Sequence, residues 1–140
     1  ALRDGSEPNR PGWKVRVVPN KFAALSLSTK WEGVRHPDIF TTISGYGAHE
    51  VIIETPRHNQ TLATLPQEQV EGVLQVVLQR MRTLAQENHI AFVQVFRNHG
   101  AAAGTSLGHP HSQLIATPIV PTNIREEIEE ARRFYDDRVT

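Results

Sequence analysis

The strongest periodic signal in the chain is the sequence Val70-Glu71-Gly72-Val73-Leu74-Gln75-Val76-Val77-Leu78-Gln79-Arg80-Met81-Arg82-Thr83-Leu84-Ala85. Apolar residues recur three and four positions apart, which aligns them on one face of an α-helix. The residues expected on this face are Val70, Val73, Leu74, Val77, Leu78, Met81, Leu84 and Ala85. The pattern predicts a helix over about residues 65–88. Thr64 with Gln67 suggests a capping box, and Pro66 suits the first turn.

Shorter segments on both sides of this helix have the alternation and β-branched composition of strands. We expect strands at residues 13–18, 47–55, 91–96 and 109–116, a further extended piece at 22–27, and a last helix that begins near Asn123. This order predicts an α+β domain with a mostly antiparallel sheet, one long helix packed on it, and a C-terminal helix. Residues 1–12, rich in Pro and Gly, are expected to be a lead-in loop, and residues 13–140 a single domain.

Composition excludes several classes of function. The 140 residues carry 15 Lys+Arg and 15 Asp+Glu, so bulk charge gives no basic surface for nucleic acid. There is no cysteine, which excludes a disulfide or a thiolate metal site within the chain. No apolar run approaches the roughly 18 residues of a membrane span. We therefore expect a cytoplasmic protein that binds neither nucleic acid nor membranes.

The densest group of polar residues begins the last expected strand and is His109-Pro110-His111-Ser112-Gln113. Alternate residues of a strand point to the same face, so His109, His111 and Gln113 are expected side by side. Three polar side chains in line make a poor core but a suitable wall for an active site. His49 and Glu50, on an earlier strand, are candidate neighbours of the active site, although a polar pair that faces solvent is the simpler interpretation and the one we expect.

A loop of small residues precedes this strand and has the sequence Asn98-His99-Gly100-Ala101-Ala102-Ala103-Gly104-Thr105-Ser106-Leu107-Gly108. Small residues let backbone N–H groups approach an anion closely, and hydroxyls add donors. The arrangement predicts a phosphate held in front of an imidazole, which is a competent nucleophile at phosphorus. His99 is a candidate contact to that phosphate. Two alternatives remain open: the loop is only a tight connection, or His109 and His111 bind zinc with His58 as a third ligand.

The motif Gly108–Gln113 resembles the HPHxQ motif of the galactose-1-phosphate uridylyltransferase family, the transferase branch of the histidine-triad superfamily. The hydrolase branch has a third histidine where Gln113 stands. Residues Val95–Ser106 are similar to the family's segment that leads into the motif. Arg16–Phe22 is similar to its nucleotide-contacting segment, and Pro56–His58 to a segment with a metal-binding histidine. The resemblance implies a histidine-triad-like fold.

The resemblance also implies roles for individual residues. His111 would attack the α-phosphorus of a nucleoside-diphosphate sugar and carry the nucleotidyl group. Gln113 would hydrogen-bond the phosphoryl oxygens without supplying acid, because an amide does not protonate. The remaining contacts to the nucleotide and its phosphates would come from Asn20, Asn98, Gly104, Thr105 and Ser106.

A zinc ion is implied as well, with His58 and His109 as two of its ligands. The family's other two ligands are a cysteine pair, which this chain lacks. Either that pair lies upstream of Ala1, which we expect, or this member of the family lacks the metal. The chain is then expected to be the N-terminal half of a longer enzyme built from two such halves, which pairs as a homodimer. Glu127 stands where some members bind a second metal, although a solvated helix residue is the simpler interpretation.

The leading hypothesis is a UDP-glucose–hexose-1-phosphate uridylyltransferase of galactose metabolism. An adenylyltransferase of the ADP-glucose phosphorylase type is the alternative, because nothing in the motif recognises the base. A histidine-triad hydrolase is a further alternative, which Gln113 disfavours. A zinc-stabilised module that binds nucleotides without chemistry also remains open.

Overall fold

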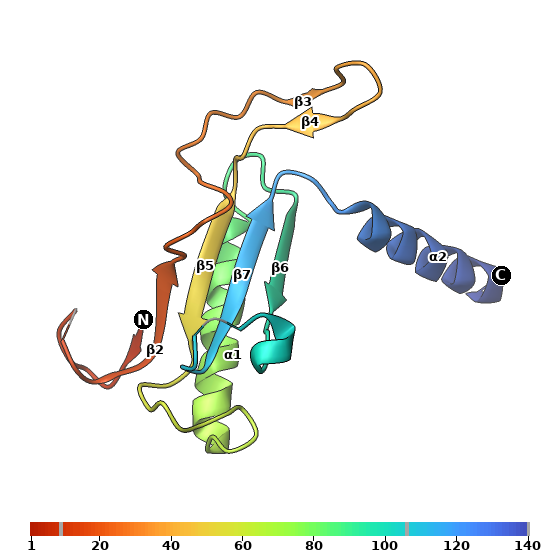
Figure 1. Cartoon of the computed structure of the whole chain (residues 1–140). Coiled ribbons are helices and arrows are strands. Elements are labelled where there is room, and N and C mark those ends of the chain that lie inside the picture. The colour runs from red at the N-terminus through yellow and green to blue at the C-terminus, as the bar shows by residue number, and fades with distance from the viewer. Residues whose placement is uncertain (9, 106, 140) are drawn as a thin grey trace.

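A five-stranded antiparallel sheet forms the centre of the computed structural model, which describes residues 1–8, 10–105 and 107–139 (Figure 1). Its strands, in spatial order, are β1 (Leu2–Arg3), β2 (Trp13–Pro19), β5 (Ala48–Ile53), β7 (His111–Thr117) and β6 (Phe92–Phe96). The predicted α+β class is confirmed. Strand β1 lies within the region expected to be a lead-in loop and pairs with β2.

The segment at residues 22–27, expected to be extended, is not a strand. It makes one isolated parallel bridge, from Ser26 to Tyr46. The chain between β2 and β5 instead forms a separate two-stranded sheet of β3 (Val34–Arg35) and β4 (Thr42–Ile43), which extends beyond one end of the main sheet (Figure 1). Gly47 then leads into β5 with φ +148°, at a place where a Cβ would collide with the Ala116 carbonyl oxygen.

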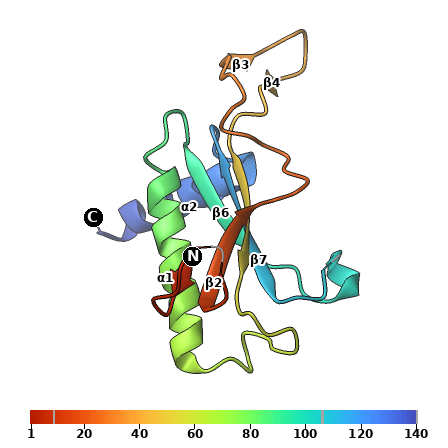
Figure 2. The same cartoon turned by 90° about the vertical axis from the view of Figure 1, so that its left-hand side faces the viewer.

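Helix α1 (Gln67–Leu84) covers one face of the sheet (Figure 2). Val15, Ile52 and Leu114 of the three central strands are completely buried beneath it. The helix contributes Val73, Val76 and Leu84 to this core, with Val77 and Met81 partly buried. The expected buried face was therefore too wide, because Leu74 and Leu78 are 61% and 47% exposed and Ala85 is exposed as well. Val76, which was not expected on this face, is buried. The stripe of α1 that contacts the sheet is narrower than the whole apolar surface of the helix.

The predicted capping box at the start of α1 is wrong. The helix begins at Gln67, and Pro66 is its N-cap residue without a side-chain cap. Thr64 therefore lies two residues too early, and its hydroxyl instead donates to the Thr61 carbonyl and accepts the Thr61 N–H. The helix ends at Leu84 rather than near residue 88, with Ala85 as its C-cap residue.

Glu50 points toward α1 and not toward solvent as expected. Two hydrogen bonds join it to Arg80, from Nε to Oε2 at 2.9 Å and from a terminal nitrogen to Oε1 at 2.6 Å. The Glu50 carboxylate raises the pKa of the Arg80 guanidinium, against the opposing effect of burial. This ion pair fastens the helix to β5.

Helix α2 (Thr122–Val139) follows β7 and projects away from the sheet (Figure 1). None of its described residues is buried, and Ile128 and Tyr135, expected on its apolar face, are 60% and 63% exposed. Across the described residues, neither this helix nor α1 is both long enough and apolar enough to cross a membrane.

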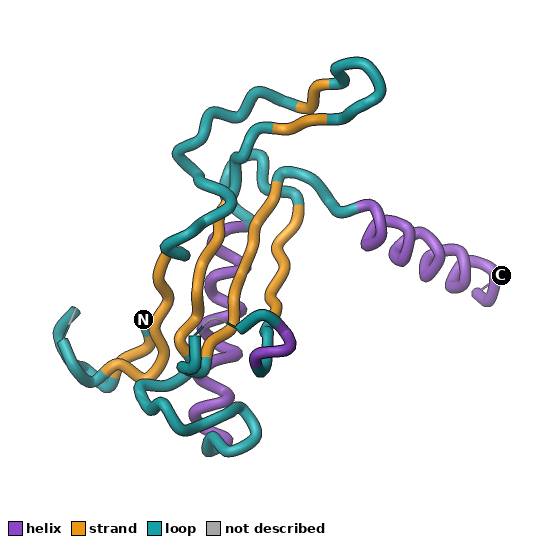
Figure 3. Tube along the Cα trace, viewed as in Figure 1, coloured by secondary structure: helices purple, strands orange, loops and turns teal. Residues whose placement is uncertain are grey.

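The loops that bear on function gather at one end of the main sheet (Figure 3). β5 and β6 end there and β7 begins there, because β7 runs antiparallel to both of its neighbours. The chain after β5 and the loop between β6 and β7 therefore meet at the first residue of β7, which is His111.

Candidate active site

Strand β7 places His111 and Gln113 on the face that α1 leaves uncovered. The intervening residues Ser112, Leu114 and Ala116 are buried on the helix side. This alternation confirms that His111 and Gln113 share a face. The expectation for His109 is wrong, since the strand begins two residues later than predicted and His109 lies in the turn before it.

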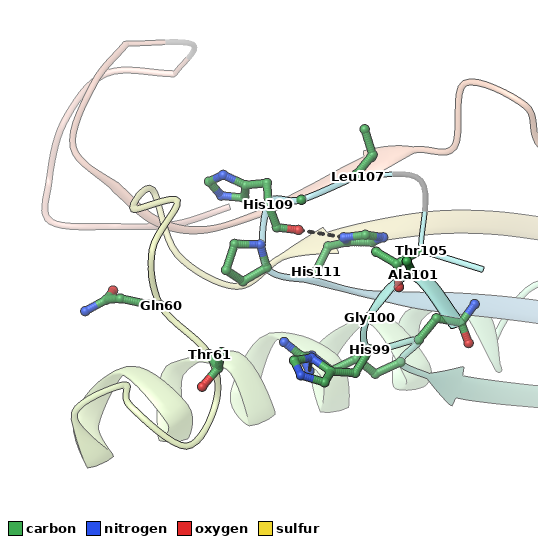
Figure 4. A pocket seen from close by; sticks show the side chains of 13 residues that line it. Gln60, Thr61, His99, Gly100, Ala101, Thr105, Leu107, His109 and His111 are labelled. Carbon is green, nitrogen blue, oxygen red and sulfur yellow. Dashed lines mark hydrogen bonds between the residues drawn. The ribbon is translucent and has the colours of Figure 1, made fainter. Parts of the chain in front are cut away.

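The side chain of His111 is held in one orientation by its own turn. Its Nδ1 lies 2.8 Å from the carbonyl oxygen of His109, the bond drawn in Figure 4. A carbonyl oxygen only accepts, so Nδ1 carries the proton and donates it. The neutral imidazole then keeps its lone pair on Nε2. A nucleophilic nitrogen is thereby fixed at the end of the sheet.

A cavity of about 380 Å³ lies in front of His111 (Figure 4). Its walls come from the loop after β6, from residues 107–111, and from Gln60 and Thr61 of the loop after β5. The volume is within the usual range for small-molecule sites. Asn98 and Thr105, both predicted to bind phosphate, line it, as does His99. The hydroxyl of Thr105 is buried and has no hydrogen-bond partner among the described residues, so it is available to a ligand.

One other predicted phosphate contact, Gly104, is not part of this wall. Gly104 is absent from the lining and ends the short 3₁₀ helix Ala101–Ala103 with φ +76°. Ser106 lies outside the described residues. Glu127 is exposed on α2, which leads away from the sheet (Figure 1).

Asn20 joins a second group of polar side chains that the sequence did not reveal. Its Nδ2 lies 3.2 Å from Gln113 Oε1 and 3.0 Å from His49 Nε2, and His49 Nε2 lies 2.8 Å from Gln113 Oε1. Asn20 directly follows β2, and His49 and Gln113 lie on β5 and β7, the next two strands of the sheet. The expectation that His49 faces solvent is therefore wrong, because His49 is half-buried against Gln113.

His58 and His109 face each other beside the cavity. Their Nδ1 atoms are 3.0 Å apart, and their rings are nearly perpendicular. His109 Nε2 lies 2.6 Å from the Thr55 carbonyl oxygen and so donates to it, which leaves a lone pair on His109 Nδ1. A histidine held this way by a backbone carbonyl is typical of a metal ligand.

The pair fits two of the four ligands of a structural zinc site. Residues 1–8, 10–105 and 107–139 contain no cluster of three or more histidine and acidic side chains able to hold a metal. The alternative of a site built from His58, His109 and His111 is not formed, because no three such side chains among the described residues lie close enough together to share a metal ion.

A buried acidic group lies behind strand β7 and was also missed. Glu54 is completely buried, accepts the hydroxyl of Ser112 at 2.6 Å, and accepts Arg97 Nε at 3.1 Å. Arg97 also lines the cavity, where a terminal nitrogen lies 3.2 Å from His99 Nδ1. The sequence signal was Ser112, a polar residue on the otherwise apolar buried side of β7.

Comparison with known proteins gives one family. The model of the galactose-1-phosphate uridyl transferase N-terminal domain matches residues 6–121. ADP-glucose phosphorylase of Arabidopsis thaliana is 34% identical over 129 residues, which are 91% of this chain and 36% of that protein. Galactose-1-phosphate uridylyltransferase of Thermotoga maritima is 34% identical over 119 residues, 85% of this chain and 37% of that protein.

A solved structure agrees with these relatives. The crystal structure of an ADP-glucose phosphorylase from Arabidopsis thaliana with bound ADP-glucose superimposes with a TM-score of 0.79 at 29% identity, over 94% of this chain and 40% of that one. The chain spans somewhat more than a third of the length of these curated relatives. The range matched by the family model contains both facing histidines and all the described residues that line the cavity. The chain therefore belongs to the galactose-1-phosphate uridyl transferase family.

Proposed function

We propose that the protein carrying this chain transfers a nucleotidyl group from a nucleoside-diphosphate sugar, through a covalent intermediate on His111. The observation that carries the proposal is the hydrogen bond from His111 Nδ1 to the His109 carbonyl, because it leaves Nε2 as the nucleophile. A bond forms between Nε2 and the α-phosphorus, and the bond from that phosphorus to the bridging oxygen breaks. The sugar 1-phosphate leaves with the electron pair.

The second half of the cycle reverses this chemistry with a different acceptor. An oxygen of a sugar phosphate or of inorganic phosphate attacks the α-phosphorus, and the bond to Nε2 breaks. Asn98, Thr105 and Gln113 are the donors proposed to stabilise the charge on the phosphoryl oxygens. Fixed donors of this kind often lower the barrier of a group transfer more than any other single effect.

The favoured donor is UDP-glucose, which makes the protein a uridylyltransferase that serves galactose metabolism. The family model and the Thermotoga maritima relative support this choice. The Arabidopsis thaliana relative and the complex with ADP-glucose support an adenylyl donor as the second candidate.

The donor is tested by incubating the protein that carries this chain with UDP-glucose or ADP-glucose labelled at the α-phosphorus. We expect acid-labile, base-stable label on the protein from UDP-glucose. Label from ADP-glucose alone would transfer the assignment to the phosphorylase type. Free mononucleotide produced without an acceptor would indicate a hydrolase, and binding without label would indicate a nucleotide-binding module.

We further propose that His58 and His109 bind zinc through their facing Nδ1 atoms, with a cysteine pair of the longer protein as the other ligands. A closed site of this kind contributes folding free energy. We also propose a homodimer, which the family resemblance implies, and a cytoplasmic location, which follows from the expectation based on composition.

Substitution of the exposed ligand, His58→Ala, is expected to remove zinc and lower the melting temperature. Zinc content by elemental mass spectrometry and thermal unfolding measure both effects on the same sample. His36→Ala is the matched control, because His36 is an exposed histidine that contacts Thr41 far from the pair. Full zinc content in the His58→Ala variant would contradict the assignment of this ligand.

A further inference from the structure

The polar cluster of Asn20, His49 and Gln113 lies on the same face of the sheet as His111. Three of its atoms form a triangle: Asn20 Nδ2, His49 Nε2 and Gln113 Oε1, separated by 2.8 to 3.2 Å. Atoms this close must be divided between hydrogen-bond donors and acceptors. The division decides which end of the Gln113 amide points into the cluster.

Two backbone N–H groups determine which of these three atoms are donors and which is the acceptor. The N–H of Phe22 donates to Asn20 Oδ1 at 2.9 Å, so Asn20 presents its NH₂ group to the cluster. The N–H of Ala24 donates to His49 Nδ1 at 3.3 Å, so Nδ1 is the acceptor and the proton of the neutral imidazole is on Nε2. Both Asn20 Nδ2 and His49 Nε2 are then donors. The Gln113 atom between them is the acceptor, with one lone pair for each.

The opposite assignment, with His49 Nε2 as an acceptor, leaves the Ala24 N–H without an acceptor. If His49 Nε2 were the acceptor, the proton would be on Nδ1 and would face the Ala24 N–H. A backbone donor would then have no partner in the cluster, which costs free energy wherever water does not replace it. The assignment with Gln113 Oε1 as acceptor gives the Phe22, Ala24, Asn20 and His49 donors an acceptor each. The 3.0 Å contact between Asn20 Nδ2 and His49 Nε2 is then not a hydrogen bond, because the two atoms are donors that share Gln113 Oε1.

Orientation of the Gln113 amide follows from this. Its oxygen is occupied by two donors, and its Nε2 points away from them. Within the described part of the chain, Gln113 Nε2 has no hydrogen-bond partner. An amide turned the other way would offer its oxygen to the phosphoryl group and repel it. A glutamine without such partners adopts both orientations, because the two ends of the amide are equal in size.

We propose that His49 is a positioning residue that fixes the Gln113 amide with its NH₂ group free for the phosphoryl oxygens. The inference rests on the proposed function, in which Gln113 contacts those oxygens beside His111. His49 does not touch the reacting atoms. It acts through Gln113, and its own orientation comes from the backbone amide of Ala24.

The kinetic test is a double-mutant cycle in the protein that carries this chain. His49→Leu is expected to slow formation of the nucleotidyl-histidine in a single turnover by about 10- to 100-fold, the usual effect of losing a residue that orients a functional group. Affinity for the nucleotide sugar should change little. His49→Gln, which keeps an N–H donor near the Nε2 position, should recover most of the rate. His36→Leu is the control and should match the unsubstituted protein.

The decisive comparison uses the Gln113→Ala background. If His49 acts only through Gln113, adding His49→Leu there should slow the reaction less than about twofold. A loss that is as large as in the unsubstituted background would overturn the inference and indicate a general structural role. Equal rates for His49→Gln and His49→Leu would overturn it as well.

Nitrogen NMR of the histidine rings tests the tautomer without any activity measurement. Neutral His49 is expected to carry its proton on Nε2, and a proton on Nδ1 would overturn the inference. The two proposals therefore fail differently. Absence of label from any nucleotide sugar contradicts the proposed function, whereas additive kinetics or the wrong tautomer contradicts only the role of His49.

Discussion

Replacement of His111 by glycine is expected to abolish transfer of label from an α-phosphorus-labelled nucleotide sugar to the protein. Among the described residues that line the cavity, no other imidazole is held in the same way, with Nδ1 bonded to the carbonyl of the preceding turn at 2.8 Å and Nε2 left unprotonated. Turnover should fall by about 10⁶-fold, the loss known when a covalent nucleophile is removed from an enzyme.

The same substitution should leave the fold intact. His111 is only partly buried, and helix α1 packs on the other face of the sheet (Figure 2). We expect its melting temperature to stay near that of the unsubstituted protein, and binding of the nucleotide sugar to persist. His99→Ala is an informative companion, because His99 is an imidazole on the same cavity wall. Label that remains on His111→Gly protein and disappears from His99→Ala protein would move the nucleophile to His99.

The strand alternation around His111 could be predicted from the sequence because it depends on local geometry alone. Residues two apart on a strand share a face wherever the strand lies. The first residue of the strand was harder to predict. β7 begins at His111, and His109, in the turn before the strand, faces His58. The residues alone suggested His58 and His109 only as part of a three-histidine zinc site with His111, and the family resemblance implied the pair without His111.

Contacts that depend on register between strands could not be predicted in this way. His49 reaches Gln113 because β5 pairs with β7 so that His49 is opposite Ile115 and Val51 is opposite Gln113. A shift of one residue would have turned His49 to the helix side. Glu50 shows the same dependence, since it lies on that side and meets Arg80. The apolar periodicity of α1 gave the helix correctly but overestimated how much of it the sheet would cover.

The buried pair of Glu54 and Arg97 is the feature on which stability of the site should depend most. Glu54 is fully buried, and its Oε1 accepts both Arg97 Nε and the Ser112 hydroxyl. Its Oε2 is buried without a hydrogen-bond partner in the described residues. Its N–H also donates to the Pro110 carbonyl at 3.2 Å. Glu54 therefore contacts both neighbours of His111, Pro110 and Ser112, from behind the sheet.

Glu54→Leu is expected to destabilise the protein by about 3 kcal/mol. Removing one member of a buried ion pair typically costs about 3–5 kcal/mol, because the other charge is left without compensation. The lower end applies here, since the Arg97 side chain keeps 22% exposure to solvent. The urea midpoint of unfolding measures the change, provided that the slope of the transition stays the same.

The double variant Glu54→Leu with Arg97→Met separates the charge from the space that the side chains fill. Replacing both members of a buried ion pair by apolar residues of similar volume is often neutral or stabilising. The double variant should therefore recover most of the lost stability. Its labelling of His111 should nevertheless be slower than in the unsubstituted protein, because Ser112 has lost its acceptor and the cavity has lost a cation. A double variant no more stable than Glu54→Leu alone would show that packing, and not the unpaired charge of Arg97, causes the loss. Full labelling in the double variant would show that the pair behind β7 supports only the fold and not the position of His111.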